Sequence, residues 1–362
     1  MSFLEDNAAY EEWLGRQCDV VDADLKLKHE RMGKNAFGFL RATYFRWAKT
    51  IEALCPDLAE APALLAVGDA HLSNFGTWRD AEGRLVWGVN DFDDAAVIPY
   101  PFDLVRLCTS VRLTNGLAIK GREAAAAIIA GYENGLAAPR PLFLDAQEAW
   151  LRPFLAASDA ERRKFWQEID DLPAAEPDKA IRDGFAKSLP EGAANLRFAS
   201  QSKGGGSLGK PRFVAMAQWR GGRVVREAKA VTPSAWNWAH GGKSVKSHFL
   251  DLATSAHRAP DPFLISHRHF IFRRLSPDAR KLDLEQGVPA GLEALFLQAM
   301  GFELGSLHAA DAKGADVAAH LDAQPADWLA KASKAAAQAV KKDFKEWKEA
   351  AAPKADAKAA VA

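Results

Sequence analysis

Two short acidic segments near the N-terminus carry residue types that can bind a metal ion and accept a proton. In the first segment, Asp69 and Asn74 lie five positions apart, and in the second, Asp91 follows Asn74 by seventeen positions. Phosphoryl transfer needs a carboxylate that orients the attacking hydroxyl and accepts its proton, and oxygen ligands that hold a metal ion on the phosphates. Mg²⁺ prefers one or two carboxylates together with substrate phosphates. The two segments therefore predict an oxygen-rich site for Mg²⁺ in which Asp69 acts as the base.

Other interpretations of these segments stay open. Asx-rich turns also bring Asp and Asn together, because their short side chains bond to their own backbone. His71 either shapes the loop through a ring hydrogen bond or binds a metal ion. Asp93 and Asp94 add negative charge, and a solvated acidic turn is the alternative for both. Asp91 and Asp93 also have the Asp-x-Asp spacing of phosphatases that use an aspartate nucleophile.

A glycine-rich segment in the second half of the chain offers a phosphate-binding loop. Gly204, Gly206 and Gly209, with Ser207 between them, form a G-x-G-x-x-G pattern that lets backbone N–H groups approach an anion closely. A dinucleotide-binding loop needs a following helix, whereas a strand is expected after Gly209. Lys229 lies twenty positions later between apolar neighbours, which predict an inward-facing ammonium group that could reach phosphates under the loop. A lysine on a surface edge strand is the alternative.

Short apolar runs place both acidic segments directly after strands. Residues 63–67 and 85–89 are strand candidates, and turn-prone residues lie between them at 79–83. Residues 203–231 predict a glycine turn followed by a β-hairpin with its turn at Gly221 and Gly222. A further strand is expected over residues 270–275.

Helical patterns occupy much of the remaining chain. The expected helical regions are residues 3–57, with one helix over 35–54, residues 103–171, with breaks near 116–117 and 138–141, residues 291–308, and residues 331 to about 351. Residues 172–200 are mixed in character and predict a connection. Residues 243–255 are a weaker helical candidate.

Composition limits the classes of partner. The 47 basic residues balance 47 acidic residues, so the chain has no overall charge bias toward nucleic acid. Three widely spaced cysteines fit neither a disulfide framework nor a zinc site. No run approaches the roughly 20 apolar residues that span a bilayer, and the N-terminus lacks the apolar run of a secretory signal. We expect a cytoplasmic protein with no nucleic-acid or membrane partner.

These motifs together resemble the protein-kinase-like superfamily, and most closely the bacterial family of domain of unknown function 2252 (DUF2252). The resemblance extends from about residue 32 to about residue 311, and it rests on residues 68–76, 90–94, 101–107, 206–209 and 227–229. In small-molecule kinases a similar Gly-Asp-x-His-x-x-Asn loop carries the catalytic aspartate. The resemblance therefore implies that Asp69 is the base, that Asn74 and Asp91 are metal ligands, and that Asp103 is a buried acceptor that steadies the catalytic loop.

The motifs occur in a different order from that of a kinase, which a circular permutation explains, because a fold survives when its ends are joined and it is cut at an exposed loop. The resemblance implies an α+β, two-lobed protein-kinase-like fold with additional helices. Its expected parts are an N-terminal helical segment (1–59) packed on the large lobe, the first part of the helical catalytic lobe (60–200), the small β-rich nucleotide lobe (201–285), the remaining catalytic-lobe helices (286–351) and a flexible tail (352–362). A hinge near residues 273–276 would bond adenine.

The activity that follows from this resemblance is transfer from ATP, with Mg²⁺, to a hydroxyl group of an unidentified small molecule or protein. The nucleotide would be bound by Gly204, Gly206, Ser207, Gly209 and Lys229. Trp236, Trp238 and His240 either line an acceptor pocket or pack in the core.

One departure from the kinase pattern keeps other functions open. Kinases orient their lysine with a glutamate from a helix, but no glutamate lies between Glu227 and Glu285, and the expected helix at 243–255 offers only Asp251. A nucleotide-binding pseudokinase or regulatory protein is therefore one alternative. Another is an AMP transferase that uses the same site with the nucleotide reversed.

Overall fold

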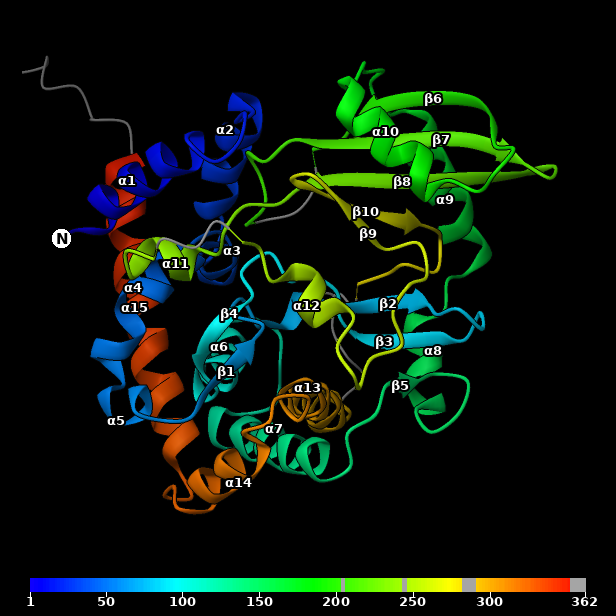
Figure 1. The fold of residues 1–362 in the computed structure, drawn as a ribbon. Coiled ribbons are helices and arrows are strands. Elements are labelled where there is room, and N and C mark those ends of the chain that lie inside the picture. The colour runs from blue at the N-terminus through cyan, green and yellow to red at the C-terminus, as the bar shows by residue number, and fades with distance from the viewer. Residues whose placement is uncertain (203–205, 243–245, 282–290, 352–362) are drawn as a thin grey trace, which may run out of the picture.

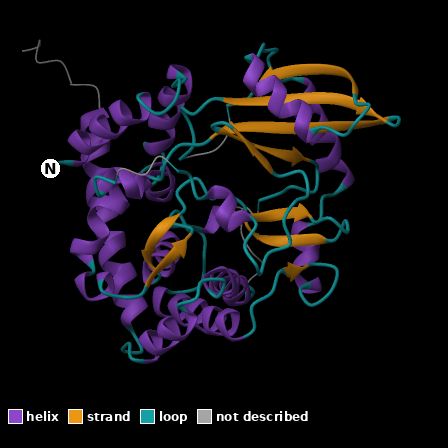
Figure 2. Ribbon diagram, viewed as in Figure 1, coloured by secondary structure: helices purple, strands orange, loops and turns teal. Residues whose placement is uncertain are grey.

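Helices and several antiparallel sheets combine in this α+β protein, which confirms the predicted fold class at that level. The computed structural model describes residues 1–202, 206–242, 246–281 and 291–351. In Figure 1 a five-stranded sheet lies at the upper right, a smaller sheet lies below it, and helices form the left and the bottom of the molecule. Figure 2 shows the same division by secondary structure.

The N-terminal residues are helical, as predicted. They form α1 (Phe3–Gly15), α2 (Asp22–Met32), α3 (Ala36–Ala42), α4 (Tyr44–Leu54) and α5 (Pro56–Ala59). The single helix expected over residues 35–54 is broken at Thr43, whose backbone is not helical. Its hydroxyl donates to the Phe39 carbonyl oxygen (2.7 Å) and so satisfies one of the open carbonyls at the end of α3. The long helix α15 (Trp328–Ala351) packs against α1, α3 and α4.

Both acidic segments follow strands, as predicted. β1 (Ala63–Ala66) pairs with β4 (Ala96–Pro99), and the first acidic segment, with the short helix η1 (Leu72–Asn74), follows β1. β2 (Phe75–Arg79) and β3 (Leu85–Val89) form the hairpin that leads to the second segment. The two-residue strand β5 (Leu142–Phe143), which was not predicted, pairs with β3.

Two helices from distant parts of the sequence lie side by side beneath these strands. α7 (Gly121–Ala137) and α13 (Glu293–His308) make extensive contact, and Figure 1 shows them together at the bottom of the molecule. The predicted breaks in the helical region 103–171 are present. Its further elements are α6 (Pro101–Leu113), η2 (Ala149–Leu151), α8 (Arg152–Leu155) and α9 (Asp159–Asp170), and α14 (Gly314–Asp322) follows α13.

The five-stranded sheet has the order β6-β7-β8-β10-β9, and every neighbouring pair is antiparallel. Its strands are β6 (Ala194–Ser200), β7 (Arg212–Trp219), β8 (Gly222–Ala230), β9 (Ile265–His267) and β10 (Phe270–Leu275). The predicted hairpin and the strand at 270–275 are confirmed. The prediction of a connection over 172–200 is wrong, because this segment holds α10 (Lys179–Ser188) and β6. Most β6 side chains are exposed at the sheet edge, so the strand lacks the apolar alternation that reveals a half-buried strand.

Strand alternation gives this sheet two distinct faces. Ala228 and Phe272 lie on the face that packs against α10, whereas Val214 and Val225 lie on the face that packs against α9. Because successive side chains alternate, Glu227 and Lys229 share the second face with Val225.

The remaining short helices connect the sheet to the rest of the molecule. α11 (Ala235–Ala239) and α12 (Phe249–Ala253) follow β8. Trp236 belongs to the main core and stacks on His240, and Trp238 packs on Tyr10 and Phe45, which favours core packing over an acceptor pocket. None of the helices within the described ranges combines the length and apolar character needed to cross a membrane.

Candidate functional site

The loop that carries Asp69 is held by a buried carboxylate. Asp103, fully buried near the start of α6, accepts hydrogen bonds from the backbone N–H groups of Val67 and Gly68 (both 2.8 Å). His308, at the end of α13, lies 3.2 Å from the same carboxylate. Gly68 has φ +76° and a Cβ there would lie 2.3 Å from the Asp94 carbonyl oxygen, so the tight turn requires glycine. Asp103 thus has the steadying contacts that the family resemblance implied.

Arg106 fixes the carboxylate of Asp69. Its Nε donates to Asp69 Oδ1 (2.7 Å), and its Nη2 lies 2.5 Å from the same oxygen. Burial raises the pKa of the Asp69 carboxyl above its ordinary value, although Arg106 acts in the opposite direction. The carboxylate therefore has one defined orientation, and its environment favours proton acceptance. No role was predicted for Arg106 from the sequence. Its position three residues after Asp103 on one helix nevertheless places the two side chains on the same helix face, which could have indicated a shared role.

His71 shapes the loop and does not belong to a metal-binding cluster. Its Nδ1 accepts a hydrogen bond from the Ser73 N–H group (3.2 Å). Burial, with the charges of Arg41 and Arg106, holds the pKa of His71 well below its ordinary value, so the ring is neutral. Among the described residues, no group of three or more His, Cys, Asp or Glu side chains is arranged to hold a metal ion.

Asn74 connects the two acidic segments. Its Nδ2 donates to the backbone oxygens of Asp69 (3.1 Å) and Asp91 (3.0 Å), which fixes the orientation of the amide because both partners are acceptors. Its Oδ1 is buried and has no hydrogen-bond partner within the described part of the chain. A buried acceptor without a partner is costly, so this oxygen fits a ligand for a hard cation.

Lys229 pairs with the second acidic segment across 138 sequence positions. Its Nζ lies 2.8 Å from Asp91 Oδ1 and 2.6 Å from Asp93 Oδ1, and the side chain is 2% exposed. Burial alone would raise the pKa of Asp91, but Lys229 and Lys281 outweigh it and hold the pKa well below its ordinary value. The inward orientation of Lys229 agrees with the sequence prediction, which assigned its ammonium group to phosphates and named neither Asp91 nor Asp93 as its partner.

Asp251, which the 243–255 segment offers as a partner for Lys229, does not fill that role, because Lys229 pairs with Asp91 and Asp93. Asp251 pairs with Lys246 and His248 (both 2.8 Å) and not with Lys229. Its helix, α12, begins only at Phe249 and is five residues long.

Asp93 and Asp94 are not solvated turn residues. Asp93 is 10% exposed and also lies 3.5 Å from Lys210, which follows the glycine loop. Asp94 Oδ1 accepts a hydrogen bond from the N–H group of Ala235 at the start of α11 (2.8 Å). Burial raises the pKa of the Asp94 carboxyl to about 6. Asp94 thus connects the acidic segment to the chain that follows β8.

The glycine loop approaches the acidic residues through Gly206 and Ser207. A Cβ on Gly206 would lie 2.8 Å from the Arg41 carbonyl oxygen and 3.8 Å from Asp69 Oδ2. Gly209 has φ +97° and packs elsewhere, because its carbonyl oxygen accepts the N–H group of Val21 (2.9 Å) and its Cβ position meets Leu25 of α2. Gly204, also predicted to bind the nucleotide, lies outside the described residues.

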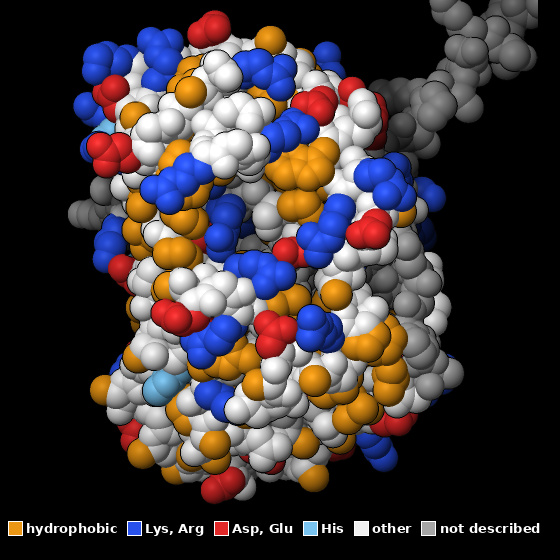
Figure 3. Space-filling view, turned by 90° about the vertical axis from the view of Figure 1, so that its right-hand side faces the viewer, with side chains coloured by type: hydrophobic (Ala, Val, Ile, Leu, Met, Phe, Trp, Pro, Cys, Tyr) orange, Lys and Arg blue, Asp and Glu red, His pale blue; other side chains and the backbone are white. Residues whose placement is uncertain are grey.

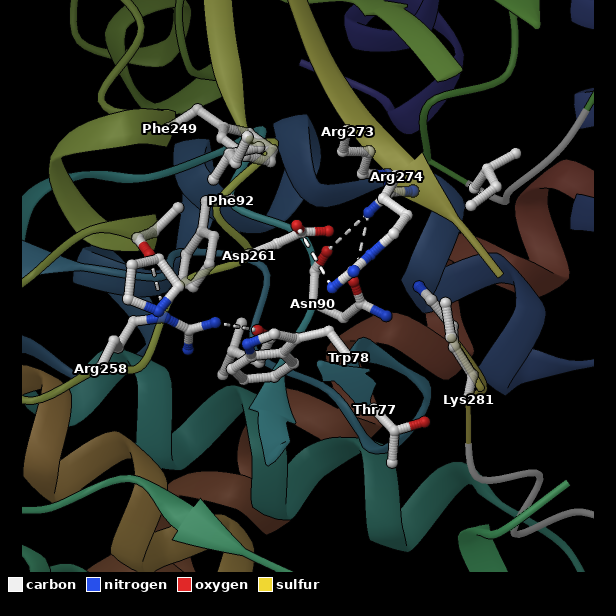
Figure 4. Close-up of a pocket in the computed structure, with 16 residues that line it drawn as sticks. Thr77, Trp78, Asn90, Phe92, Phe249, Arg258, Asp261, Arg273, Arg274 and Lys281 are labelled. Atoms are coloured by element: carbon white, nitrogen blue, oxygen red, sulfur yellow. Dashed lines mark hydrogen bonds and ion pairs between the residues drawn. The ribbon is translucent and has the colours of Figure 1, made fainter. Parts of the chain in front are cut away.

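Two cavities lie at or beside this site. A small polar cavity of about 60 Å³ is lined by Asp69, Asn74, Asp91, Asp93, Gly206, Ser207 and their neighbours. A larger cavity of about 270 Å³ lies beside the predicted hinge, and Figure 4 shows Trp78, Phe92 and Phe249 among the residues that line it. Lys281 lines both cavities. On the face seen in Figure 3, Lys and Arg side chains gather around a hollow at mid-height, below the part that holds the five-stranded sheet.

Three basic residues of the small cavity were not predicted from the sequence, namely Arg41, Lys210 and Lys281. Lys210 directly follows the G-x-G-x-x-G pattern, which is a usable signal. Burial lowers the pKa of Lys210, but Asp93 and Asp94 outweigh it and raise the pKa above its ordinary value. Arg41 and Lys281 lie in segments without any recognisable motif, and only the tertiary structure brings them to the cavity.

One family model matches the N-terminal part of the chain. Residues 20–165 match the model of a family described as "Uncharacterized protein conserved in bacteria (DUF2252)". The matched range contains Asp69, Asn74 and Asp91 but ends before the glycine loop and Lys229. No curated protein and no solved structure matches the chain.

Proposed function

We propose that this chain, whose residues 20–165 match the DUF2252 family model, is a Mg²⁺- and ATP-dependent phosphotransferase of the kinase-like type. Its acceptor is a hydroxyl group of an unidentified small molecule or protein. The observation that carries the proposal is the contact of Lys229 with Asp91 and Asp93, two carboxylates that line one small cavity together with Asp69, Asn74, Gly206 and Ser207. Segments far apart in the sequence thus supply, at one point, the groups that phosphoryl transfer needs.

The fold gives further support. The glycine loop lies between the first and second strands of the five-stranded sheet, and Lys229 lies on the third strand. Protein kinases likewise have a glycine-rich loop over the phosphates and a lysine on their third strand. Together with the catalytic-loop segment that precedes them, these elements support a circularly permuted, two-lobed kinase-like fold.

The larger cavity suits a nucleotide base. It has an aromatic lining on one side and the edge of β10 on the other. β10 pairs with β9 only as far as Phe272, so the backbone of residues 273–275 has no strand partner on that edge among the described residues and could bond a base. A base in this cavity would direct its phosphates toward Lys281 and the small polar cavity.

Asp69 then acts as the general base. The acceptor O–H proton passes to the Asp69 carboxylate, the acceptor oxygen forms a bond to the γ-phosphorus, and the bond from the γ-phosphorus to the β,γ-bridging oxygen breaks, which releases ADP. Arg106 keeps the carboxylate in one orientation during this step. Asn74 Oδ1 and the Asp91 carboxylate would hold Mg²⁺, which supplies charge neutralisation on the phosphates when it is bound.

A second candidate is a nucleotide-binding regulatory protein without turnover. Lys229 occupies the Asp91 and Asp93 carboxylates, and the small cavity has only about 60 Å³. These contacts would have to open before a triphosphate and Mg²⁺ could bind. This arrangement agrees with a protein that binds nucleotide weakly, or one in which nucleotide binding changes the conformation without any transfer.

Labelled ATP distinguishes these functions. We expect calorimetry to detect binding of ATP with Mg²⁺, Lys229→Met to weaken it, and Asp251→Asn, a matched change of a carboxylate outside the cavity, to leave it unchanged. Transfer of the γ-label to an acceptor or to water supports the phosphotransferase, whereas transfer of the α-label indicates an AMP transferase. Binding without transfer of either label supports the regulatory protein, and absence of any binding contradicts both candidates. Full transfer by Asp69→Asn would remove Asp69 from the base role.

A further inference from the structure

A buried carboxylate on the cavity face of the five-stranded sheet holds two arginines at once. Glu227 is fully buried, and its Oε1 accepts from Arg212 Nη1 (2.5 Å) while its Oε2 accepts from Arg273 Nε (2.6 Å). The strand register explains this arrangement, because Arg273 lies directly opposite Glu227 and Arg212 lies opposite Lys229, two residues further along the same strand face.

The two arginines extend to different parts of the candidate site. Arg212 Nη2 donates to Ser207 Oγ in the glycine loop (3.1 Å). Arg273 Nη1 donates to the backbone oxygen and to Oδ1 of Asn90 (both 3.2 Å), and Figure 4 shows these two side chains together. An unbroken series of contacts therefore runs from Ser207 through Glu227 to the residue before Asp91.

Charge makes this series costly to break. Burial would raise the pKa of Glu227, but Arg212 and Arg273 outweigh it and hold the pKa far below its ordinary value, so the carboxylate stays ionised. Removing one partner of a buried ion pair is far more disruptive than replacing the pair by apolar residues. Apolar side chains would fill this space between the strands at a lower cost in desolvation. The two arginines of the triad instead contact Ser207 in the glycine loop and Asn90 in the Asn90–Asp91 turn.

We infer that Glu227 is a positioning residue that couples the glycine loop to the Asn90–Asp91 turn through Arg212 and Arg273. Its functional meaning rests on the proposed phosphotransferase, in which Gly206, Ser207 and Asp91 of these two segments line the cavity for the phosphates. Kinases join their lysine to a helix glutamate, whereas among the described residues Lys229 pairs with Asp91 and Asp93, and the ion triad joins the glycine loop to the turn. Residues 206–210 and the Asn90–Asp91 turn are expected to open and close as one unit.

Hydrogen exchange without nucleotide tests the coupling in both directions. Arg273→Met is expected to raise exchange at least about threefold in residues 206–210, which Arg273 does not contact. Arg212→Met is expected to do the same in residues 90–94, which Arg212 does not contact, so either variant carries the test if the other fails to fold. Arg274→Met is the matched control, because Arg274 adjoins Arg273, has a similar side-chain exposure (24% against 22%) and does not contact Glu227.

Unchanged exchange at the remote segment in a folded variant, or an equal rise in Arg274→Met, would overturn the coupling.

Binding of ATP with Mg²⁺ supplies the functional readout. Each of Arg212→Met and Arg273→Met is expected to weaken it roughly tenfold, and the double variant little more, because both act through Glu227. Additive losses would mean that the two arginines act separately. Absence of ATP binding in the parent protein would refute the proposed function while leaving the exchange result intact.

Discussion

The contact between α7 and α13 depends on glycines, and adding one methyl group there should separate the two helices. A Cβ on Gly131 would lie 1.9 Å from the Gln298 carbonyl oxygen, and one on Gly301 would lie 2.2 Å from that of Ile128. Both distances are too short for any real Cβ, and in both cases the obstacle is backbone that cannot swing away. The helices can therefore approach this closely only because one of the two residues at each of these contacts is a glycine.

The cost of Gly131→Ala follows from two opposing terms. Alanine gains about 1 kcal/mol over glycine in a helix interior. Against this, ordinary contact begins near 3.4 Å, so lengthening the 1.9 Å distance to an ordinary contact moves the helices apart by about 1.5 Å. Overpacking a close interface typically costs about 1–3 kcal/mol, and separating two long helices belongs at the upper end. We expect a net loss of about 2 kcal/mol in the free energy of unfolding.

Urea denaturation measures this change directly. Gly15→Ala is the control, because Gly15 ends α1 and a Cβ there meets nothing within 4 Å. The control should unfold like the parent or slightly later, and Gly301→Ala should behave like Gly131→Ala. If Gly131→Ala were as stable as the parent, the close approach of the two helices would be wrong. The site should respond too, since α13 ends at His308, which contacts the Asp103 carboxylate behind the Asp69 loop.

Three further predictions concern the acidic residues. Asp94 has a pKa of about 6 in the folded state against an ordinary value of 3.8, so its contribution to the free energy of unfolding is largest below pH 4 and falls by at most about 3 kcal/mol as the pH rises through 6. In urea denaturation, Asp94→Asn should therefore be more stable than the parent at pH 7 and equal to it at pH 4. An Asp94→Asn variant that is no more stable than the parent at pH 7 would contradict this. Asp103→Asn leaves one loop N–H group without an acceptor, which should cost about 1–3 kcal/mol and lower any transfer rate, as melting and labelled-ATP assays would reveal. Lys229→Met should increase the pKa of Asp91, because the largest charge that lowers this pKa is removed. Titration followed by NMR measures the change, and an unchanged pKa would contradict the prediction.

Local patterns in the sequence were sufficient for the elements that present the site. The strands before Asp69 and Asp91, the hairpin that carries Lys229 and the strand at 270–275 each have an apolar run bounded by turn residues, and their geometry is decided within a few positions. The position of Asp69 and Asn74 in one loop also follows from chain proximity alone. The inward orientation of Lys229 agrees with its apolar neighbours, because they indicate a strand that is buried on both faces.

The tertiary structure decided which charges meet. Nothing near Lys229 in the sequence indicates that its partners are Asp91 and Asp93, since ion pairs across 138 positions leave no local pattern. Strand β6 was missed because an edge strand exposes both faces and loses the alternation that reveals a half-buried strand. Gly209 fits a phosphate-loop pattern, yet it packs on α2, because a positive φ serves any close approach of two chain segments and not only the approach of an anion. Sequence thus determined the chemistry that is available in each loop, and long-range packing determined which loops share a cavity.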